Sequence, residues 1–504
     1  MNRKTLCAVV FSTLAYAAGP AAPAVFNVRS YSAIGGGKTN DAPAINRAID
    51  AANAAGGGTV YFPAGKYLSG SIHLKSNVGL YLDHGAVIQA SADPEAYDAP
   101  EPNQWDKYQD FGHSHWRNSL MWGEGVDNVS ISGPGLIDGK ALTREGGQRI
   151  GNKAISLKLS RNVTIRDIQM LLCGHFAILA TGVDNLTIDN ITIDTNRDGI
   201  DVDASRNVRI SNVSVNSPWD DAIVLKASYG LGSFRDTQNV TITNSFVSGF
   251  DMGTLLDGTF QRSGKGAPDR GGPTGRIKLG TESSGGFKNI TISNCVFEYS
   301  RGLALETVDG GSLEDVTISN ITMRDVTNSP IFLRLGRRMR SPEGTPIGRM
   351  RRVNISDVVV YGADRRYASL ITGIPDHDIE DVKLNNIRIL YQGGGTREQA
   401  AIVPAESETE YPEPYRFGEM PAYGFFLRHV NGIELNNVEI GYLKEDLRPA
   451  FVLTGVTHAD FNNLKAKHAS GVPSFILKDV TAFESWHSRD IPDTRLENAR
   501  EQSL

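Results

Sequence analysis

From Thr59 onward, apolar and polar residues alternate in short runs separated by Gly, Asn and Asp. One phrase recurs: NVSISGP begins at Asn128, NVTIRDI at Asn162, NLTIDNI at Asn185 and NVRISNV at Asn207. Further copies follow as NVTITNS and NITISNC, and degenerate ones as DVTISNI, VNISDV, DVKLNNI and GIELNNV. Alternation of this kind predicts β-strands, and no clear helical pattern separates the copies.

The spacing of the phrase indicates a repeating architecture. The copies at Asn162, Asn185 and Asn207 lie 23 and 22 residues apart. Short strands at this period, without intervening helices, predict a parallel β-helix, an all-β fold in which stacked turns share one apolar core. The asparagines tolerate left-handed turns and can form side-chain ladders. A leucine-rich repeat or a propeller is disfavoured because their LxxLxL and WD signatures are missing.

One helix is expected near the N-terminus, in NDAPAINRAIDAANAAGGG from Asn40 to Gly58. Asn40 or Asp41 can cap it, Pro43 suits its first turn, and its apolar stripe consists of Ile45, Ala48, Ile49 and Ala52. We expect this helix to cover the open N-terminal end of the β-helix, where unpaired strand edges would promote aggregation.

The first residues have the features of a secretory signal. Arg3 and Lys4 precede an apolar stretch, and AYA at Ala15 to Ala17 is a small-residue cleavage signal. No later segment is apolar for the roughly 18 residues that a membrane span needs. We therefore expect a soluble protein in the periplasm or outside the cell. The expected organisation is a signal peptide at 1–17, cap and first turns at 25–110, a β-helical catalytic domain at 111–480 and a C-terminal tail at 481–504.

Charge and cysteine content exclude some classes of function. The formal net charge of −6 shows no basic face, so nucleic acid is not an expected partner. Cys173 and Cys295 lack metal-type spacing, and we favour two buried free thiols over a disulfide. The two histidines of GHSHW have no recognisable third ligand. We expect no metal, no cofactor, no membrane contact and a monomer.

The stretch from Thr195 to Lys226 interleaves carboxylates with strand-like residues. One turn of about 22 residues brings Asp198 next to Asp220 and Asp221, at the strand spacing of about 4.8 Å. Like charges stacked in this way repel each other, which a purely structural role does not explain. Cleavage of a glycosidic bond uses such a group of acids. The two other acids, which also fit strand ends and turns, are expected to shape or line the site: Asp201 and Asp203.

At these residues the chain resembles glycoside hydrolase family 28, the polygalacturonase and rhamnogalacturonan hydrolase family. NRDGID, from Asn196, is similar to the family's NTDG(I/F)D, with Arg197 in place of Thr, and WDDAIVLK matches its DD segment. The resemblance implies a right-handed, single-stranded, pectin-lyase-like β-helix. It also implies inverting hydrolysis, with Asp220 as general acid and Asp198 and Asp221 activating water. The candidate substrate-binding residues of these motifs are Asn196, Asp201 and Lys226.

Two further motifs of the family are altered. Gly275 stands where the histidine of GHG is expected, and Glu306 lies in the segment that corresponds to RIK. Glu306 would repel a uronate, whereas Arg276 and Lys278 could supply the missing positive charge from the neighbouring turn. Alternatively, the central sugar is neutral, as rhamnose is. We include four residues of these segments among the candidate substrate-binding residues: Arg276, Lys278, Glu282 and Glu306.

An insertion from Gly249 to Thr274 is glycine-rich and polar, which predicts a loop. If it closes one end of the cleft, the enzyme would attack chain ends; a passive surface loop is the alternative.

The leading hypothesis is a secreted, polygalacturonase-like glycoside hydrolase that acts on a pectic polysaccharide. A related alternative is an exo-hydrolase of rhamnogalacturonan or of another neutral or acidic glycan. Two other classes remain: a β-helical polysaccharide lyase, which would need a calcium-binding acid cluster and a base, and a noncatalytic glycan-binding protein.

Overall fold

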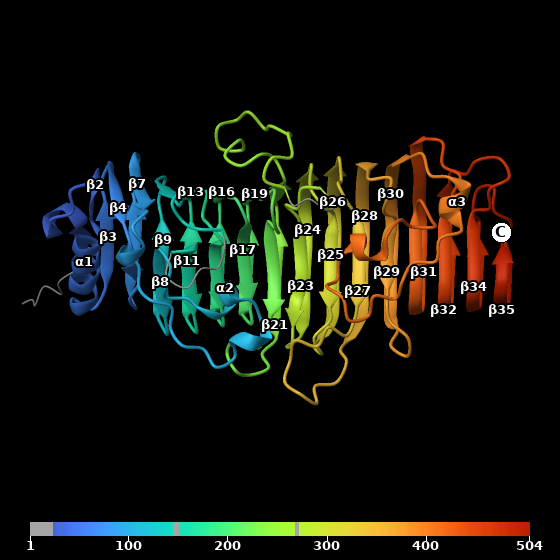
Figure 1. The fold of residues 1–504 in the computed structure, drawn as a ribbon, viewed down its shortest axis with the longest axis horizontal. Coiled ribbons are helices and arrows are strands. Elements are labelled where there is room, and N and C mark those ends of the chain that lie inside the picture. The colour runs from blue at the N-terminus through green and yellow to red at the C-terminus, as the bar shows by residue number, and fades with distance from the viewer. Residues whose placement is uncertain (1–23, 145–150, 268–271) are drawn as a thin grey trace, which may run out of the picture.

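The computed structural model describes residues 24–144, 151–267 and 272–504. These residues form one elongated stack of parallel strands that begins beside helix α1 (Ala42–Ala54) and ends at β35 (Thr494–Ser503) (Figure 1). The predicted signal peptide at 1–17 lies outside the described residues. Within the described ranges, no helix combines the length and apolar character needed to cross a membrane.

Three parallel sheets make up the faces of the stack, each built from successive turns. The first sheet contains β5 (Ile72–His73), β8 (Met121–Glu124), β11 (Lys153–Lys158), β14 (Phe176–Thr181), β17 (Asp198–Asp203), β20 (Ile223–Ala227), β23 (Ile277–Ser283), β25 (Leu303–Thr307), β27 (Ile331–Leu335) and β29 (Ser369–Thr372). The second contains β1 (Val25–Asn27), β3 (Gly58–Phe62), β6 (Val78–Leu82), β9 (Asp127–Ser132), β12 (Arg161–Arg166), β15 (Asp184–Asp189), β18 (Arg206–Ser211) and β21 (Thr237–Thr243). The third contains β2 (Gly36–Asn40), β4 (Gly65–Ser69), β7 (Ala86–Ala90), β10 (Leu136–Asp138), β13 (Gln169–Leu171), β16 (Thr192–Asp194), β19 (Ser214–Asn216) and β22 (Phe246–Ser248).

Later strands are longer because they continue from one sheet into the next. Those that join the second and third sheets are β24 (Phe287–Glu298), β26 (Ser312–Arg324), β28 (Arg349–Ala363) and β30 (Ile379–Gly393). The last turns are formed by β31 (Phe425–Lys444), β32 (Phe451–Asn462), β33 (Lys465–Ala466) and β34 (Phe475–Trp486). Short helices in the connections are α2 (Phe111–Ser114), α3 (Arg397–Ala400) and the 3-10 turns Val28–Tyr31, Pro94–Ala96, Asp106–Tyr108 and Pro414–Phe417.

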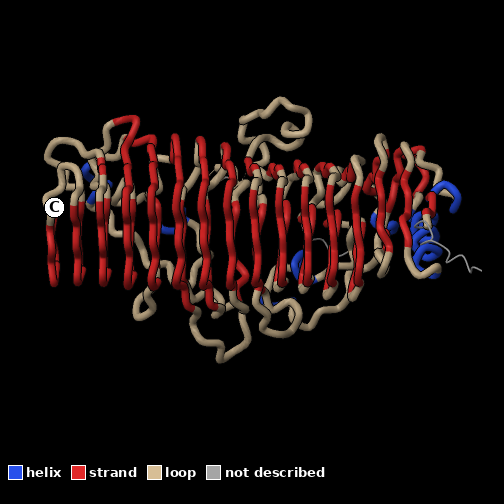
Figure 2. Tube along the Cα trace, turned by 180° about the vertical axis from the view of Figure 1, so that it is seen from behind, coloured by secondary structure: helices blue, strands red, loops and turns tan. Residues whose placement is uncertain are grey.

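The register between turns explains the core. Ile178 pairs with Ile200, Ile200 with Ile223 and Ile223 with Ile277, and all four side chains are fully buried. Each isoleucine therefore buries apolar surface against its equivalents on the turns above and below. This arrangement is the predicted right-handed parallel β-helix, whose strands are drawn in red in Figure 2.

An asparagine ladder runs along the second sheet, and its members are the first residues of the recurrent phrase. Each side-chain amide donates to the side-chain oxygen of the preceding member at 2.8–3.1 Å: Asn162 to Asn128, Asn185 to Asn162, Asn207 to Asn185, Asn239 to Asn207 and Asn289 to Asn239. All six have φ between 55° and 58°, in the left-handed region. The predicted ladder and the predicted backbone conformation are both confirmed.

Both ends of the stack are covered. α1 packs against β1 and β3, and the predicted stripe of Ile45, Ala48, Ile49 and Ala52 is fully buried. At the other end, residues 481–504, which were expected to form a tail, complete β34 and form β35, which pairs antiparallel with it. The antiparallel strand stops further parallel addition of turns along part of this edge.

Cys173 and Cys295 are both buried and free, as the sequence favours. Burial raises the pKa of Cys295 to about 11, so this thiol stays protonated and packs as a small apolar group.

The ladder yields a stability prediction at Asn207, whose φ is 56°. Asn207→Ala should lower the free energy of unfolding by about 2 kcal/mol, since alanine loses ladder hydrogen bonds and adopts the left-handed region at a cost of about 1–2 kcal/mol. Asn207→Gly loses the same bonds without the strain and should be less destabilised. Urea unfolding of both variants measures this, and an alanine variant more stable than the glycine variant would contradict it.

Candidate active site

Three carboxylates from two consecutive turns meet at one edge of the first sheet. Asp198 is the first residue of β17, and Asp220 and Asp221 precede β20 on the next turn. The pairing of Ile200 with Ile223 sets this register. One carboxylate oxygen of each acid lies within 4.8 Å of the others. This is the proximity that the 22-residue period predicts.

The three acids differ in their access to solvent. The Asp220 side chain is 29% exposed, whereas those of Asp198 and Asp221 are 4% and 3% exposed. A bound molecule can therefore reach Asp220 most directly, while Asp198 and Asp221 form the floor behind it.

Arg197 lies between two of the acids. Its Nε is 3.2 Å from Oδ2 of Asp220 and 3.6 Å from Oδ2 of Asp198. One terminal nitrogen is also 3.4 Å from Nδ1 of His175, on the preceding turn. Arg197 stands in place of the Thr of the family motif, and the sequence alone gave this substitution no role. The structure shows that its charge compensates the repulsion between the acids.

The environment separates the proton affinities of the acids. Burial, and then the neighbouring charge of Asp220, raise the pKa of Asp198 well above its usual value, although Arg197 opposes this. Burial alone would also raise the pKa of Asp221, but Lys278 and Arg276 hold it at about 2. Asp221 is thus a permanent anion near neutral pH, whereas Asp198 is able to carry a proton.

The same three acids are spaced closely enough to hold a metal ion. Two of them are already compensated by positive side chains, Asp198 by Arg197 and Asp221 by Arg276. A divalent cation would have to bind next to these guanidinium groups, which electrostatic repulsion disfavours. The site is better suited to proton transfer than to metal binding.

The structure corrects the expectation that Arg276 and Lys278 hold a substrate carboxylate. Their side chains are 2% and 1% exposed. Arg276 donates from Nε to Asp221 at 2.7 Å, and Lys278 lies 3.5 Å from Asp221 and 3.3 Å from Glu306. Glu306 is fully buried, so it does not face a substrate, and burial raises its pKa to about 7 despite the two cations. These residues support Asp221 instead.

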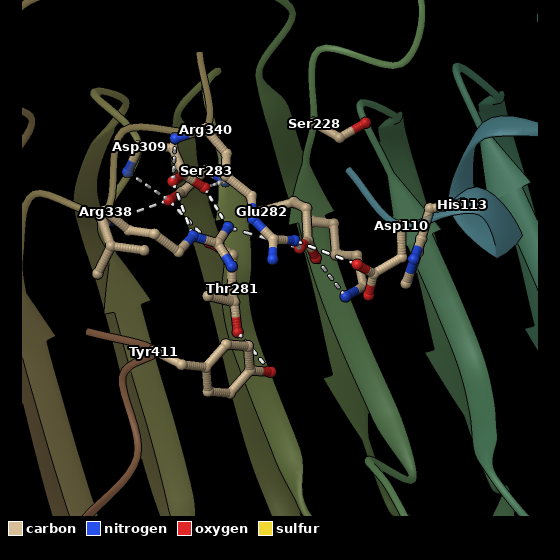
Figure 3. Close-up of polar contacts among 12 residues, drawn as sticks. Asp110, His113, Ser228, Thr281, Glu282, Ser283, Asp309, Arg338, Arg340 and Tyr411 are labelled. Atoms are coloured by element: carbon tan, nitrogen blue, oxygen red, sulfur yellow. Dashed lines mark hydrogen bonds and ion pairs between the residues drawn. The ribbon is translucent and has the colours of Figure 1, made fainter. Parts of the chain in front are cut away.

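Lys226, Asp201 and Glu282 belong to a second buried network along the same sheet. Figure 3 labels Glu282 and His113 of this network. Lys226 donates to Glu282 at 2.6 Å and lies 3.9 Å from Asp201, and Asp201 is 3.2 Å from Nε2 of His113. Burial, and then the charge of Lys226, lower the pKa of His113 well below its usual value. Lys226, Asp201 and Glu282, which were predicted to bind substrate, are at most 8% exposed and bind each other beneath the site.

Two other polar residues, Asn196 in the motif and Asp203 just after it, stabilise turns. Asn196 accepts a hydrogen bond from the backbone N–H of Gly174 at 3.1 Å. Asp203 accepts from both the backbone and the hydroxyl of Ser228, at 2.7 and 2.6 Å. Asp203 thereby holds the loop after β20 in place.

Sequence reasoning missed Glu413 and Tyr411, which contact the site from far along the chain. Glu413 accepts from Arg276 at 2.5 Å and from Arg301 at 3.0 Å. The Tyr411 hydroxyl accepts from Thr281 at 3.0 Å, a contact visible in Figure 3. Glu413 is 137 positions from Arg276, and no motif or period relates them.

Comparisons with known proteins agree with this architecture. A family described as rhamnogalacturonase A/epimerase, pectate lyase-like, matches residues 25–218. A probable polygalacturonase of Vitis vinifera is 25% identical over 388 residues, 71% of this chain and 73% of that protein. An endo-polygalacturonase of Pectobacterium carotovorum is 25% identical over 298 residues, 52% and 71% of the two chains. The structure of a hyperthermoactive exopolygalacturonase from Thermotoga maritima has a TM-score of 0.61 at 19% identity and covers 83% of this chain and 92% of that one.

The fold and the acid cluster thus define a protein of the pectin-lyase-like β-helix class. Within that class, the chain is similar to polygalacturonases, at 25% identity.

The burial of Arg276 predicts a structural role. Arg276→Met should lower the free energy of unfolding by about 3–5 kcal/mol, because Asp221 and Glu413 would lose their buried cation. The matched control is Arg161→Met in the exposed pair with Asp127, which should cost no more than about 1 kcal/mol. Urea unfolding compares the two. Equal stability of both variants would show that Arg276 is not needed by the fold.

Proposed function

We propose that the protein is an exported hydrolase that cleaves O-glycosidic bonds of a pectic polysaccharide. The observation that carries this proposal is the set of three carboxylates within 4.8 Å, one partly exposed and two buried against cations. General acid–base hydrolysis of a glycoside requires a proton donor and an ionised carboxylate in one site. The similarity to polygalacturonases supports pectin as the substrate.

The roles follow from exposure and charge. Burial and the charge of Asp220 raise the pKa of Asp198, so Asp198 can hold a proton beside Asp220. This proton passes to Asp220, which is partly exposed and donates it to the leaving oxygen. Asp198, then ionised, activates a water molecule together with Asp221, whose charge is kept by Arg276 and Lys278.

The stereochemical course is proposed to be inversion, as the motifs imply. The short separation of the acids differs from the roughly 6.5–9.5 Å between the carboxyl groups of most inverting enzymes. Proton NMR of the first product anomer decides the point. A product with the opposite anomeric configuration to the substrate supports water activation, whereas retention would indicate that an aspartate attacks the sugar.

Homogalacturonan, rhamnogalacturonan I oligosaccharides and neutral glycans form the substrate panel. New reducing ends released from a galacturonate-containing member support the proposal, and cleavage of neutral members alone would contradict it. Unsaturated products that absorb in the ultraviolet, together with loss of activity in chelator, would identify a lyase instead.

Export is part of the proposal and rests on the N-terminal charges and the AYA sequence. N-terminal sequencing of the protein from the extracellular or periplasmic fraction tests it, and an intact Met1 in the mature protein would contradict it.

The catalytic assignment predicts the effect of two substitutions. Asp198→Asn and Asp220→Asn should each reduce turnover by at least about a hundredfold, the usual size of lost acid or base assistance. Asp127→Asn, which changes an exposed acid on the second sheet, is the control and should leave turnover unchanged. Circular dichroism confirms folding, and wild-type turnover in either test variant removes that residue from the mechanism.

Arg197 predicts a shift in the pH profile. Arg197 lowers the pKa of Asp198, so Arg197→Gln should raise it further. Because Asp198 must be ionised to activate water, the acidic limb of kcat/KM should move to higher pH. Arg197→Lys keeps the charge and should move it less. An unchanged limb in Arg197→Gln would show that the guanidinium does not act on Asp198.

A further inference from the structure

The outer face of the first sheet is covered on the C-terminal side of the acids. Phe332, Leu370 and Phe426 point away from the core of the β-helix, yet each is at most 2% exposed. They belong to a separate apolar cluster with Phe417 and Met420. We define residues 404–422 as the C-terminal covering segment. In Figure 1 the chain between β30 and β31 runs back across β29 and β27.

Polar contacts attach this segment along several consecutive turns. Arg428 donates to the backbone carbonyls of Pro404 and Ala405 at 2.8 Å. Arg334, on a turn nearer the acids, donates to the carbonyls of Glu406 and Ser407 at 2.7 and 3.0 Å. Buried guanidinium groups that satisfy backbone carbonyls make this a fixed part of the fold.

The same segment then reaches the turn directly beside the acids. Tyr411 accepts from Thr281, and Glu413 binds Arg276, which in turn donates to Asp221. One turn of a β-helix rises about 4.8 Å. A polysaccharide bound over Asp221 therefore has no free strip of the first sheet along which to continue in this direction.

The first sheet is also covered on the N-terminal side, by residues 101–118, which we define as the N-terminal covering segment. Trp116 is 1% exposed, packs on Leu179 and donates from Nε1 to Thr181 at 3.0 Å. Leu179 and Thr181 point outward on β14 and are fully buried. His113 covers Asp201 on β17.

The N-terminal covering segment is also joined to the loop that follows β27. One terminal nitrogen of Arg340 lies 3.2 Å from Oδ1 of Asp110 and 3.8 Å from Oε1 of Glu282. Figure 3 labels these three residues. Arg340 and Asp110 are 39% and 53% exposed. This contact crosses the outer face of the first sheet above Glu282. The site stays open to solvent at Asp220, which is 29% exposed, and at Arg197, which is 22% exposed.

We propose that the site is a pocket that accepts the end of a polysaccharide chain, rather than a groove through which the chain passes, and that the Asp110–Arg340 contact helps to close it. The inference rests on the proposed hydrolysis and adds its mode. Attack within a chain needs sugar residues on both sides of the cleaved bond, and the covering segments occupy the sheet on both sides of the acids. Only the end of the polysaccharide can then enter the site, and the rest of the chain extends into solvent away from the two segments. Each cleavage therefore releases a short terminal product.

This assigns chain-end attack to a different element from the one that the sequence suggested. The described part of the insertion from Gly249 to Thr274, the loop that projects from the stack in Figures 1 and 2, attaches to the third sheet. Its backbone donates from Gly253 and Leu255 to Asp194, at 2.9 and 2.8 Å. The residues that fill the first sheet come instead from 101–118 and 404–422.

Product sizing at low conversion of homogalacturonan tests the mode on the unmodified protein. A single short product from the first time point, with slow loss of viscosity, is expected. Intermediate oligosaccharides of mixed length at the start would overturn the inference. A second test uses oligosaccharides that are blocked at one end, either by reduction of the reducing end or by a cap at the other end. One of the two kinds should be cleaved and the other should resist cleavage. Equal cleavage of both would also overturn the inference.

A binding measurement separates failure of the pocket from failure of the proposed function. In Asp220→Asn, the affinity for galacturonate oligosaccharides should stop rising after the first few sugars, because further residues leave the pocket. An affinity that keeps rising with length would overturn the pocket even if no substrate is hydrolysed. Absence of hydrolysis by the unmodified protein, with the affinity reaching a plateau, would contradict the hydrolase alone.

The Asp110→Asn, Arg340→Gln double variant tests the closing contact. Its products should lose the single short size and include longer oligosaccharides. The control is Arg388→Gln, Glu439→Gln, another exposed ion pair, on the third sheet, which should keep the wild-type products. Wild-type products from the Asp110 and Arg340 variant would overturn the role of this contact.

Discussion

The stacking of turns in register is the constraint on which the rest of this structure depends. Each turn places its residues about 4.8 Å from their equivalents on the next. The apolar positions benefit from this, because Ile200 and its neighbours form a continuous buried column. The same geometry forces Asp198 next to Asp220 and Asp221, so the repeat that builds the core also concentrates negative charge.

Neighbouring cations compensate this negative charge, but more completely at Asp221 than at Asp198 and Asp220. Asp221 is held by Arg276 and Lys278, which are buried and further paired with Glu306 and Glu413. Arg197, which is partly exposed, serves Asp198 and Asp220. Asp221 is consequently fixed as an anion, whereas the raised pKa of Asp198 allows this acid to carry a proton. This difference is what a general acid and a base need, and it arises from the depth at which each cation lies.

The period made the fold and the acids predictable, because both depend on local sequence repeated at a constant interval. The asparagine ladder and the proximity of Asp198 to Asp220 and Asp221 follow directly from it. The covering segments do not repeat and contact the first sheet across long separations, such as the 137 positions between Arg276 and Glu413. The prediction that Arg276 and Lys278 are free to bind a substrate was therefore wrong, because part of what buries them comes from a distant segment of the chain.

The missing histidine and the unexpected glutamate of the family motifs have one explanation in packing and charge. Gly275 has a φ of 47°, and a Cβ placed there would lie 2.0 Å from the carbonyl oxygen of Ser248. A histidine cannot stand at this position without moving the backbone. Glu306 pairs with Lys278, so its charge is used to retain the cation beneath Asp221 rather than to meet a ligand. The substitutions thus belong to a site whose charges are balanced internally, in which Asp220 and Arg197 remain partly exposed.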